Sequence, residues 1–299
     1  MDKNKASEMI QSAQKKVELY FPQYKSLIND ISVYLSSSKD KLQTRNQIAR
    51  EIGAKEETEI NDIAGQGIIG KNHYAIIMFF EEIQSFEFTH YLYHEFGHII
   101  SIVSCKDLFN EAELEINEGK ETLLRKGISI WSEFIAEVIA YRVEEAEPLS
   151  LPWVITDKLE ALMDKAVNDK YFDFYPFAFY CAIFLEDPTI DMLRYEHPCA
   201  AFGADNCDDK IMPYIEKALN ILATQLGKEE FWMIDKTTVC DLGKCHNDLW
   251  NYCKIQNIDR IVEYAISNNK HLFQMEKINL TYEEYFEKVK EILLSLDNE

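Results

Sequence analysis

Long stretches of 3.6-residue hydrophobic periodicity, with one glycine-rich interruption, constrain the fold of this chain more than any other feature. The 299 residues include only 10 glycines and 7 prolines, so few positions disrupt a helix. Helical patterns occur at 4–20, 24–36, 40–52, 83–104, 128–145, 153–169, 173–186, 209–227, 247–266 and 281–296. The chain is therefore expected to be mainly α-helical.

The interruption is residues 65–73, a segment with three glycines that breaks the helical pattern. The next residues, 74–80, read YAIIMFF and form the best strand candidate, because they are few, β-branched and aromatic. We therefore expect an α+β fold class, mainly α with a small β-sheet beside two central helices at 83–104 and 128–145. An acidic connection at 110–126 is expected to join these two helices.

Two prolines near residues 148–152 suggest a division of the chain. Residues 1–150 are expected to hold the N-terminal helices, the sheet and the two central helices. Residues 151–299 are expected to form a helical C-terminal lobe. The two parts are expected to pack as one continuous unit.

The charge balance excludes several classes of partner. The chain carries 52 acidic and 31 basic residues, which gives a formal net charge of −21. Such a chain repels phosphate backbones and anionic lipids, so neither nucleic acid nor a membrane is an expected partner. No run of 18 apolar residues occurs, and no apolar signal-peptide core follows the first residues. The seven irregularly spaced cysteines suit reduced thiols, so we expect a cytoplasmic protein, and the sequence gives no expectation for its oligomeric state.

The pattern H-E-x-x-H lies in the helical stretch 83–104, as His94, Glu95 and His98. Residues four apart in an α-helix lie about 40° apart around the axis, so both imidazoles can reach one metal ion. Histidine nitrogens suit zinc. Glu95 lies about 100° round the axis from His94, close enough to address a water on the metal without being a ligand. Glu95 is therefore the expected general base, which takes the proton of this water as it attacks a carbonyl.

The apolar surroundings favour this metal-binding interpretation over a solvated helix face with a chance His-Glu pair, because unliganded histidines are costly to bury. His90 lies about 12 Å from His98 along the helix axis. It is therefore expected to be a cleft-wall or core histidine rather than a fourth ligand. Gly97 costs up to about 1 kcal/mol relative to alanine inside a helix. Close backbone packing near the metal and simple tolerance of a glycine both remain open as its explanation.

A third ligand must come from another helix, and the stretch 128–145 offers Glu133 and Glu137 on one face. Two carboxylates on an apolar stripe repel each other unless a cation or histidines balance them. The 34 residues between His98 and Glu133 leave room for the chain to turn and return antiparallel. Glu133 is favoured as the ligand, because Ala136 leaves room for the approaching histidine helix. Glu137 remains the alternative, since the sequence does not fix the phase of the helix.

The motif His94-Glu95-x-x-His98, followed by Glu133-x-x-Ala136-Glu137, resembles the gluzincin arrangement of the zinc peptidases related to thermolysin. The spacing of Glu133, Ala136 and Glu137 also resembles the peptidases of the ImmA/IrrE group. The resemblance covers only residues 94–137. It implies a zincin-like catalytic core in which His94, His98 and Glu133 bind Zn²⁺ and Glu95 is the general base. It also implies that Glu137 orients a ligating imidazole. Such families often have aspartate or asparagine at this last position, which leaves the distance from Glu137 to its partner open.

These features predict a zinc-dependent metallopeptidase, which hydrolyses peptide bonds with a water activated by the metal and by Glu95. The expected partner is a peptide or protein substrate. One alternative is a site-specific regulatory protease with one protein target, and another is a non-catalytic, zinc-stabilised binding or regulatory protein. No pattern identifies the residue that stabilises the oxyanion, for which the candidates are Tyr141, Tyr175, Tyr180, Arg194 and His197.

Overall fold

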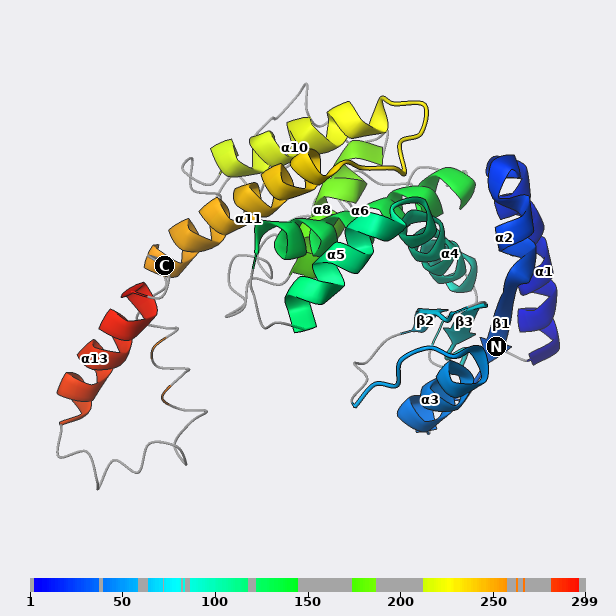
Figure 1. Cartoon of the computed structure of the whole chain (residues 1–299), viewed down its shortest axis with the longest axis horizontal. Helices are drawn as coiled ribbons and strands as arrows, with labels where there is room; N and C mark the ends of the chain where they lie inside the picture. The colour runs from blue at the N-terminus through cyan, green and yellow to red at the C-terminus, as the bar shows by residue number, and fades with distance from the viewer. Residues whose placement is uncertain are drawn as a thin grey trace.

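The computed structural model describes residues 3–37, 40–58, 64–71, 73–81, 83, 87–117, 122–144, 174–186, 212–256, 262, 266 and 281–295. Within these residues the chain is mainly helical and has one small sheet (Figure 1). The fold class expected from the sequence, mainly α with a small β-sheet, is therefore confirmed.

The sheet contains β1 (Ile31–Leu35), β2 (Gly65–Ile69) and β3 (Tyr74–Met78) in the order β1-β3-β2. The strand expected at 74–80 is β3, and it lies at the centre of the sheet. It pairs in parallel with β1 and antiparallel with β2. The glycine-rich segment was expected only to interrupt the helices, but most of it forms the edge strand β2.

The prediction of a helix at 24–36 is wrong for the second half of this range, which forms a strand. A short 3-10 turn at Pro22–Tyr24 leads into α2 (Lys25–Asp30), and the chain then continues as β1. Residues 31–35 read ISVYL, and each of the five pairs with a residue of β3. Hydrogen bonding to a strand more than 40 residues away along the chain therefore outweighs the local helical pattern.

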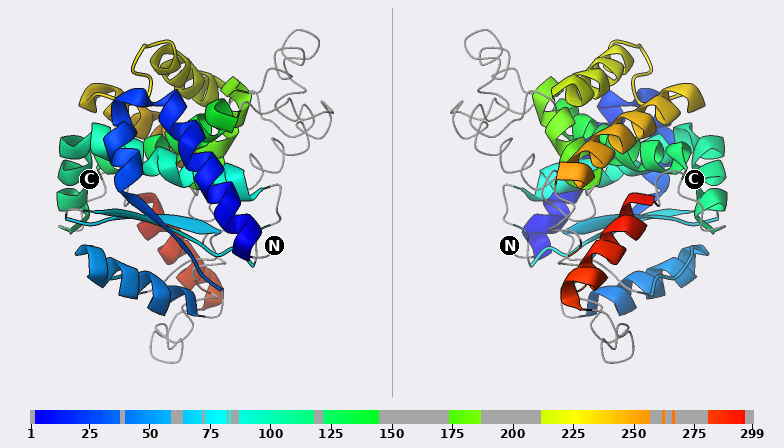
Figure 2. Two further views of the ribbon diagram at one scale, coloured as in Figure 1. Left: turned by 90° about the vertical axis from the view of Figure 1, so that its right-hand side faces the viewer. Right: turned by 90° about the vertical axis from the view of Figure 1, so that its left-hand side faces the viewer.

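Helices cover both faces of the sheet, as Figure 2 shows. On one face, Ile48 and Ala49 of α3 (Lys41–Ile52) pack with Ala75 and Ile77 of β3. On the other face, alternate residues of β3 join the main hydrophobic core, together with α1 (Lys3–Tyr20) and α4 (Phe88–Ser104). Strand β3 is buried on both faces for this reason, which explains its nearly continuous apolar sequence.

The helix α6 (Leu123–Glu144) lies at the centre of the helical part and packs against α4, α8 (Phe174–Glu186) and α11 (Lys236–Gln256) (Figure 1). Its Trp131 and Phe134 are fully buried. The remaining helices are α5 (Lys106–Asn117), α10 (Met212–Leu226) and α13 (Tyr282–Ser295). Among the described helices, none has the length and apolar content needed to cross a membrane.

Most expected helices are present, with shifted ends. The patterns at 4–20, 40–52, 173–186, 209–227 and 281–296 correspond to α1, α3, α8, α10 and α13. In contrast, α4 begins later than expected, while α6 and α11 begin earlier. Of the acidic connection expected at 110–126, residues 110–117 belong to α5 and residues 123–126 to α6. The helix expected at 153–169 and the boundary near 148–152 lie outside the described residues.

Candidate metal centre

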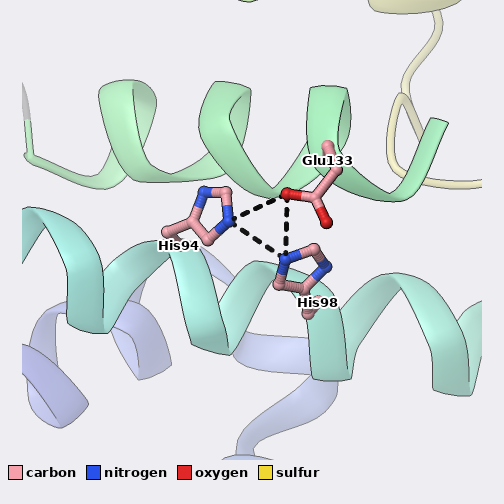
Figure 3. Close-up of side chains that lie close together, drawn as sticks. All are labelled: His94, His98 and Glu133. Atoms are coloured by element: carbon pink, nitrogen blue, oxygen red, sulfur yellow. Dashed lines mark hydrogen bonds and ion pairs between the residues drawn. The ribbon is translucent and has the colours of Figure 1, made fainter. Parts of the chain in front are cut away.

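The helices α4 and α6 bring His94, His98 and Glu133 together, and we call these three side chains the metal centre (Figure 3). The Nε2 atoms of the two histidines lie 3.0 Å apart. The Oε2 atom of Glu133 lies 3.5 Å from Nε2 of His94 and 3.6 Å from Nε2 of His98. Three potential ligand atoms from two helices therefore converge on one point.

These separations fit a single metal ion. Bonds of roughly 2.0–2.2 Å in a tetrahedral site place neighbouring ligand atoms roughly 3.3–3.5 Å apart. The three ligand atoms of the metal centre lie 3.0, 3.5 and 3.6 Å apart, which is close to the separation that such an ion requires. Among the residues that the structure describes, no fourth histidine, cysteine or carboxylate joins the group.

The far side of the His94 ring contacts Glu137, whose Oε2 lies 3.1 Å from Nδ1 of His94. Burial opposes ionisation of Glu137, but hydrogen bonds from His90 and His94 overcome this effect and lower its pKa to about 2. An ionised carboxylate only accepts hydrogen bonds, so Nδ1 of His94 carries the proton and donates it. The Nε2 lone pair of a neutral His94 then points into the metal centre, which is the tautomer that a metal requires.

His98 has a corresponding partner in Ser132, whose Oγ lies 3.0 Å from Nδ1 of His98. The contact between Ser132 and His98 was not predicted from the sequence. Ser132 directly precedes Glu133, and one turn of α6 therefore supplies both a potential ligand and a hydroxyl that orients a ligating ring. Adjacency of the serine to the glutamate was the only available signal, and it is a weak one.

The charges in the metal centre are balanced by protons when no cation is present. Burial lowers the pKa of His94, but hydrogen bonds to Glu133 and Glu137 outweigh it and raise this pKa to about 10. For Glu133 the effects have the opposite sign. Burial raises the pKa of its carboxyl group, but His98 and His94 outweigh burial and hold this pKa far below its usual value. A divalent cation can take the place of the proton shared by these groups, so binding would release protons.

The carboxylate of Glu95 is not one of the three ligand groups, but it acts electrostatically on His94 and helps to raise the pKa of that imidazole. The side chain comes from α4, and the residue is only 8% exposed. Its Oε2 accepts a hydrogen bond of 2.6 Å from the main-chain N–H of Gly67 on the edge strand β2. The residue expected to act as general base is therefore held between the histidine helix and the sheet.

A further histidine, His90, contacts Glu137 on the side away from the metal centre and also contacts Glu144. His90 places Nε2 3.1 Å from Oε1 of Glu137 and Nδ1 2.8 Å from Oε2 of Glu144. His90 was predicted from the sequence to be a cleft-wall or core histidine. Its contact with Glu144 was not predicted. A chain of polar contacts thus runs from the metal centre through Glu137 and His90 to Glu144 at the end of α6.

Solvent reaches the metal centre from the Glu133 side, since the side chain of Glu133 is 28% exposed while that of His94 is 7% exposed. The ring of Phe179 on α8 packs against His94, with ring centroids 5.5 Å apart. Of the candidates for oxyanion stabilisation, Tyr141 packs against His90 instead, with ring centroids 5.2 Å apart. The side chains of the other four candidates lie outside the described part of the chain: Tyr175, Tyr180, Arg194 and His197.

Comparison of the chain with models of protein families, with curated proteins and with solved structures gave no significant match. The geometry of the metal centre and its neighbours is therefore the basis for a functional assignment.

Proposed function

We propose that this protein is a zinc-dependent metallopeptidase of the gluzincin type. The observation that carries the proposal is the convergence of His94, His98 and Glu133 on one point, with the buried Glu95 next to His94 on α4 and acting electrostatically on its imidazole. Three protein ligands leave one position of a tetrahedral ion open for water, which is typical of catalytic zinc sites rather than structural ones. A site that only stabilised the fold would have no use for a neighbouring general base.

Zinc is the metal that the donor set favours. Two imidazole nitrogens and one carboxylate oxygen form a common ligand set of zinc hydrolases. When bound here, zinc supplies a water of lowered pKa and polarises the substrate carbonyl. Glu137 and Ser132 support this role by orienting the two ligating rings, because they contact the Nδ1 atoms that face away from the metal centre.

Glu95 would carry the protons of the reaction. Its carboxylate accepts a proton from the attacking water as the water oxygen bonds to the carbonyl carbon of the substrate. As the C–N bond breaks, the same group returns this proton to the leaving nitrogen. The products are a carboxylic acid and an amine, and Glu95 ends the cycle in its original charge state.

We propose a peptide or protein as substrate, bound in extended form beside the sheet. The central strand β3 has partners on both sides, so it has no free edge for a peptide. Strand β2 is the edge strand, and it contacts Glu95 directly through Gly67. An extended peptide can add to such an edge by main-chain hydrogen bonds. A regulatory protease with one protein target and a cytoplasmic location both remain compatible with this proposal.

The test compares the wild type with Glu95→Gln, which keeps the size of the side chain and an oxygen that can accept the Gly67 hydrogen bond. Zinc content and cleavage of a peptide library are measured for both proteins. A peptidase predicts about one zinc per chain in both proteins and cleavage by the wild type alone. Zinc in both proteins without cleavage in either would contradict the proposal and favour a zinc-stabilised binding or regulatory protein.

A further inference from the structure

We propose that the main-chain N–H of Gly67 is a positioning group for the general base, holding one oxygen of Glu95 so that the other is presented to the reacting water. This inference rests on the proposed peptidase function for its catalytic consequence. The contact itself is a property of the folded chain and can be tested without any substrate.

The register of the sheet determines where this N–H points. In an antiparallel pair, residues that exchange hydrogen bonds alternate with residues whose N–H and C=O groups face away from the partner strand. The N–H of Gly70 donates to the carbonyl of His73 at 2.9 Å, and that of Phe79 donates to the carbonyl of Ala64 at 2.9 Å. Positions 64 and 70 of the ladder therefore face β3, and by the same alternation Gly67 faces outward.

The outward amide of Gly67 meets the carboxylate of Glu95 rather than solvent, with an N···O distance of 2.6 Å. A hydrogen bond from a neutral N–H to an ionised carboxylate is shorter and stronger than one between neutral groups. Glu95 is 8% exposed, so its carboxylate is largely removed from water and needs such a donor. No lysine or arginine of the described residues forms an ion pair with Glu95.

The edge strand β2 and the helix α4 approach each other closely at Gly67. Gly67 pairs with Ile76, whose side chain lies on the face of the sheet that joins the main core with α4. A Cβ on Gly67 would lie 3.5 Å from Oε2 of Glu95 and 3.6 Å from its carbonyl oxygen. The space beside α4 at this position is therefore just large enough for a methyl group, and larger side chains would displace the carboxylate.

A carboxylate held at one oxygen has little rotational freedom. Oε2 is engaged by β2, and the Cα of Glu95 is fixed in the middle of α4, so the direction of Oε1 is determined by both elements. Catalytic groups held in this way lose little entropy on reaching the transition state. The edge strand thus contributes to the position of the base as well as to the wall of the site.

Amide hydrogen exchange, measured by NMR on the full chain, tests the contact directly. The reference is the Gly70 amide, because it is paired with His73 and does not contact Glu95. In Glu95→Ala the ratio of the Gly67 rate to the Gly70 rate is expected to rise at least about tenfold over the wild type. In Glu95→Gln, which retains an acceptor oxygen, the ratio is expected to rise less. A ratio that is the same in the wild type and in Glu95→Ala would overturn the proposal.

The catalytic consequence is tested by Gly67→Pro, which puts a ring carbon in place of the N–H, so Glu95 loses both its donor and its position while the hydrogen bonds between β2 and β3 remain. Proline is tolerated on edge strands where the missing N–H faces outward. Gly67→Ala is the matched variant, because it keeps the N–H. Zinc content is expected to be equal in the two variants, with kcat at least about tenfold lower in Gly67→Pro and KM changed less than kcat. Equal kcat in the two zinc-loaded variants would overturn the positioning role.

These two measurements separate failure of the inference from failure of the proposed function. If the wild type cleaves no peptide while the Gly67 exchange ratio responds to Glu95→Ala, the peptidase proposal fails and the Glu95–Gly67 contact stands. If the wild type is an active peptidase and the exchange ratio does not respond, the inference fails alone. If Gly67→Pro does not fold, the exchange measurement decides.

Discussion

Gly97 of α4 lies directly against the backbone of Ala136 of α6. A Cβ built on Gly97 would lie 2.7 Å from Cα of Ala136 and 3.0 Å from its carbonyl oxygen. The two helices therefore touch backbone to backbone between His94 and His98 on one side and Glu133 on the other. This contact sets the spacing across which the three potential ligand atoms meet.

We predict that Gly97→Ala destabilises the protein and weakens metal binding. Alanine normally stabilises a helix by about 1 kcal/mol relative to glycine, but here its methyl group has no space and must push α4 away from α6. Overpacking of this kind costs about 1–3 kcal/mol. Thermal unfolding and zinc titration should therefore show a lower Tm and at least about a tenfold loss of zinc affinity.

Gly227→Ala is the control for this substitution. A Cβ on Gly227 would lie 3.6 Å from the nearest atom, the carbonyl oxygen of Thr224, which is an ordinary contact. This variant should keep the Tm and the zinc affinity of the wild type. Equal behaviour of the two alanine variants would show that the contact between Gly97 and Ala136 does not limit the approach of the helices.

The roles of the two glutamates on α6 can be separated by their metal content. Glu133→Gln removes a charged oxygen from the metal centre, so zinc content should fall well below that of the wild type under the same dialysis. Glu137→Gln should still bind zinc at saturation, with an affinity about 10–100-fold lower, because the orientation of His94 is less well fixed. Loss of zinc from Glu137→Gln and retention by Glu133→Gln would reverse the assignment of the ligand.

The hydroxyl of Ser132 is expected to support zinc binding through His98. Removing it in Ser132→Ala should lower zinc affinity about 10–100-fold, because Nδ1 of His98 loses its partner. The matched control is Ser129→Ala on the same helix, since the hydroxyl of Ser129 donates only to the carbonyl of Arg125 at 3.0 Å. Competition titration against a zinc chelator measures both. A similar effect of both substitutions would assign the loss to α6 rather than to Ser132.

The sequence predicted those features of the site that depend on spacing within one helix. The positions of His94, Glu95 and His98 follow from helical geometry alone, and they lie on α4 as a contiguous group. The fold class was predictable for a similar reason, because helical periodicity and one short apolar strand are local signals. Gly97 was noticed as unusual, but only the structure distinguishes the tight contact with Ala136 from simple tolerance.

Features that depend on pairing between distant segments were not predictable in this way. Strand β1 read as the end of a helix, because its pairing with β3 is not encoded in its own periodicity. The glycines of β2 read as a break, although Gly65 makes room for α4, since a Cβ there would lie 3.3 Å from Cγ of Glu95. Ser132 and Glu144 contact histidines 34 and 54 residues away, and no local pattern marks a serine or a partly buried glutamate as such a partner.

His90 provides a pH-dependent contribution to stability that is distinct from metal binding. Burial lowers its pKa, but hydrogen bonds to Glu137 and Glu144 outweigh this effect and raise the pKa to about 9. Both carboxylates come from α6, and the ring of Tyr141 on the same helix packs against His90 as well. Each ring nitrogen faces a carboxylate oxygen, so the imidazole is held in its charged form near neutral pH.

The free energy of unfolding should reflect this charge in a defined pH window. Because the folded pKa of about 9 lies above the unfolded value of 6.5, the stabilisation is complete below pH 6.5 and is lost as pH rises through 9. The shift corresponds to about 3 kcal/mol. In urea unfolding with chelator present, His90→Gln should therefore be less stable than the wild type by about this amount near pH 6, with a much smaller difference near pH 10. His73→Gln offers the control, since the side chain of His73 is exposed and its replacement should change the stability little. A constant difference for His90→Gln would mean that its contacts stabilise the fold without holding a proton.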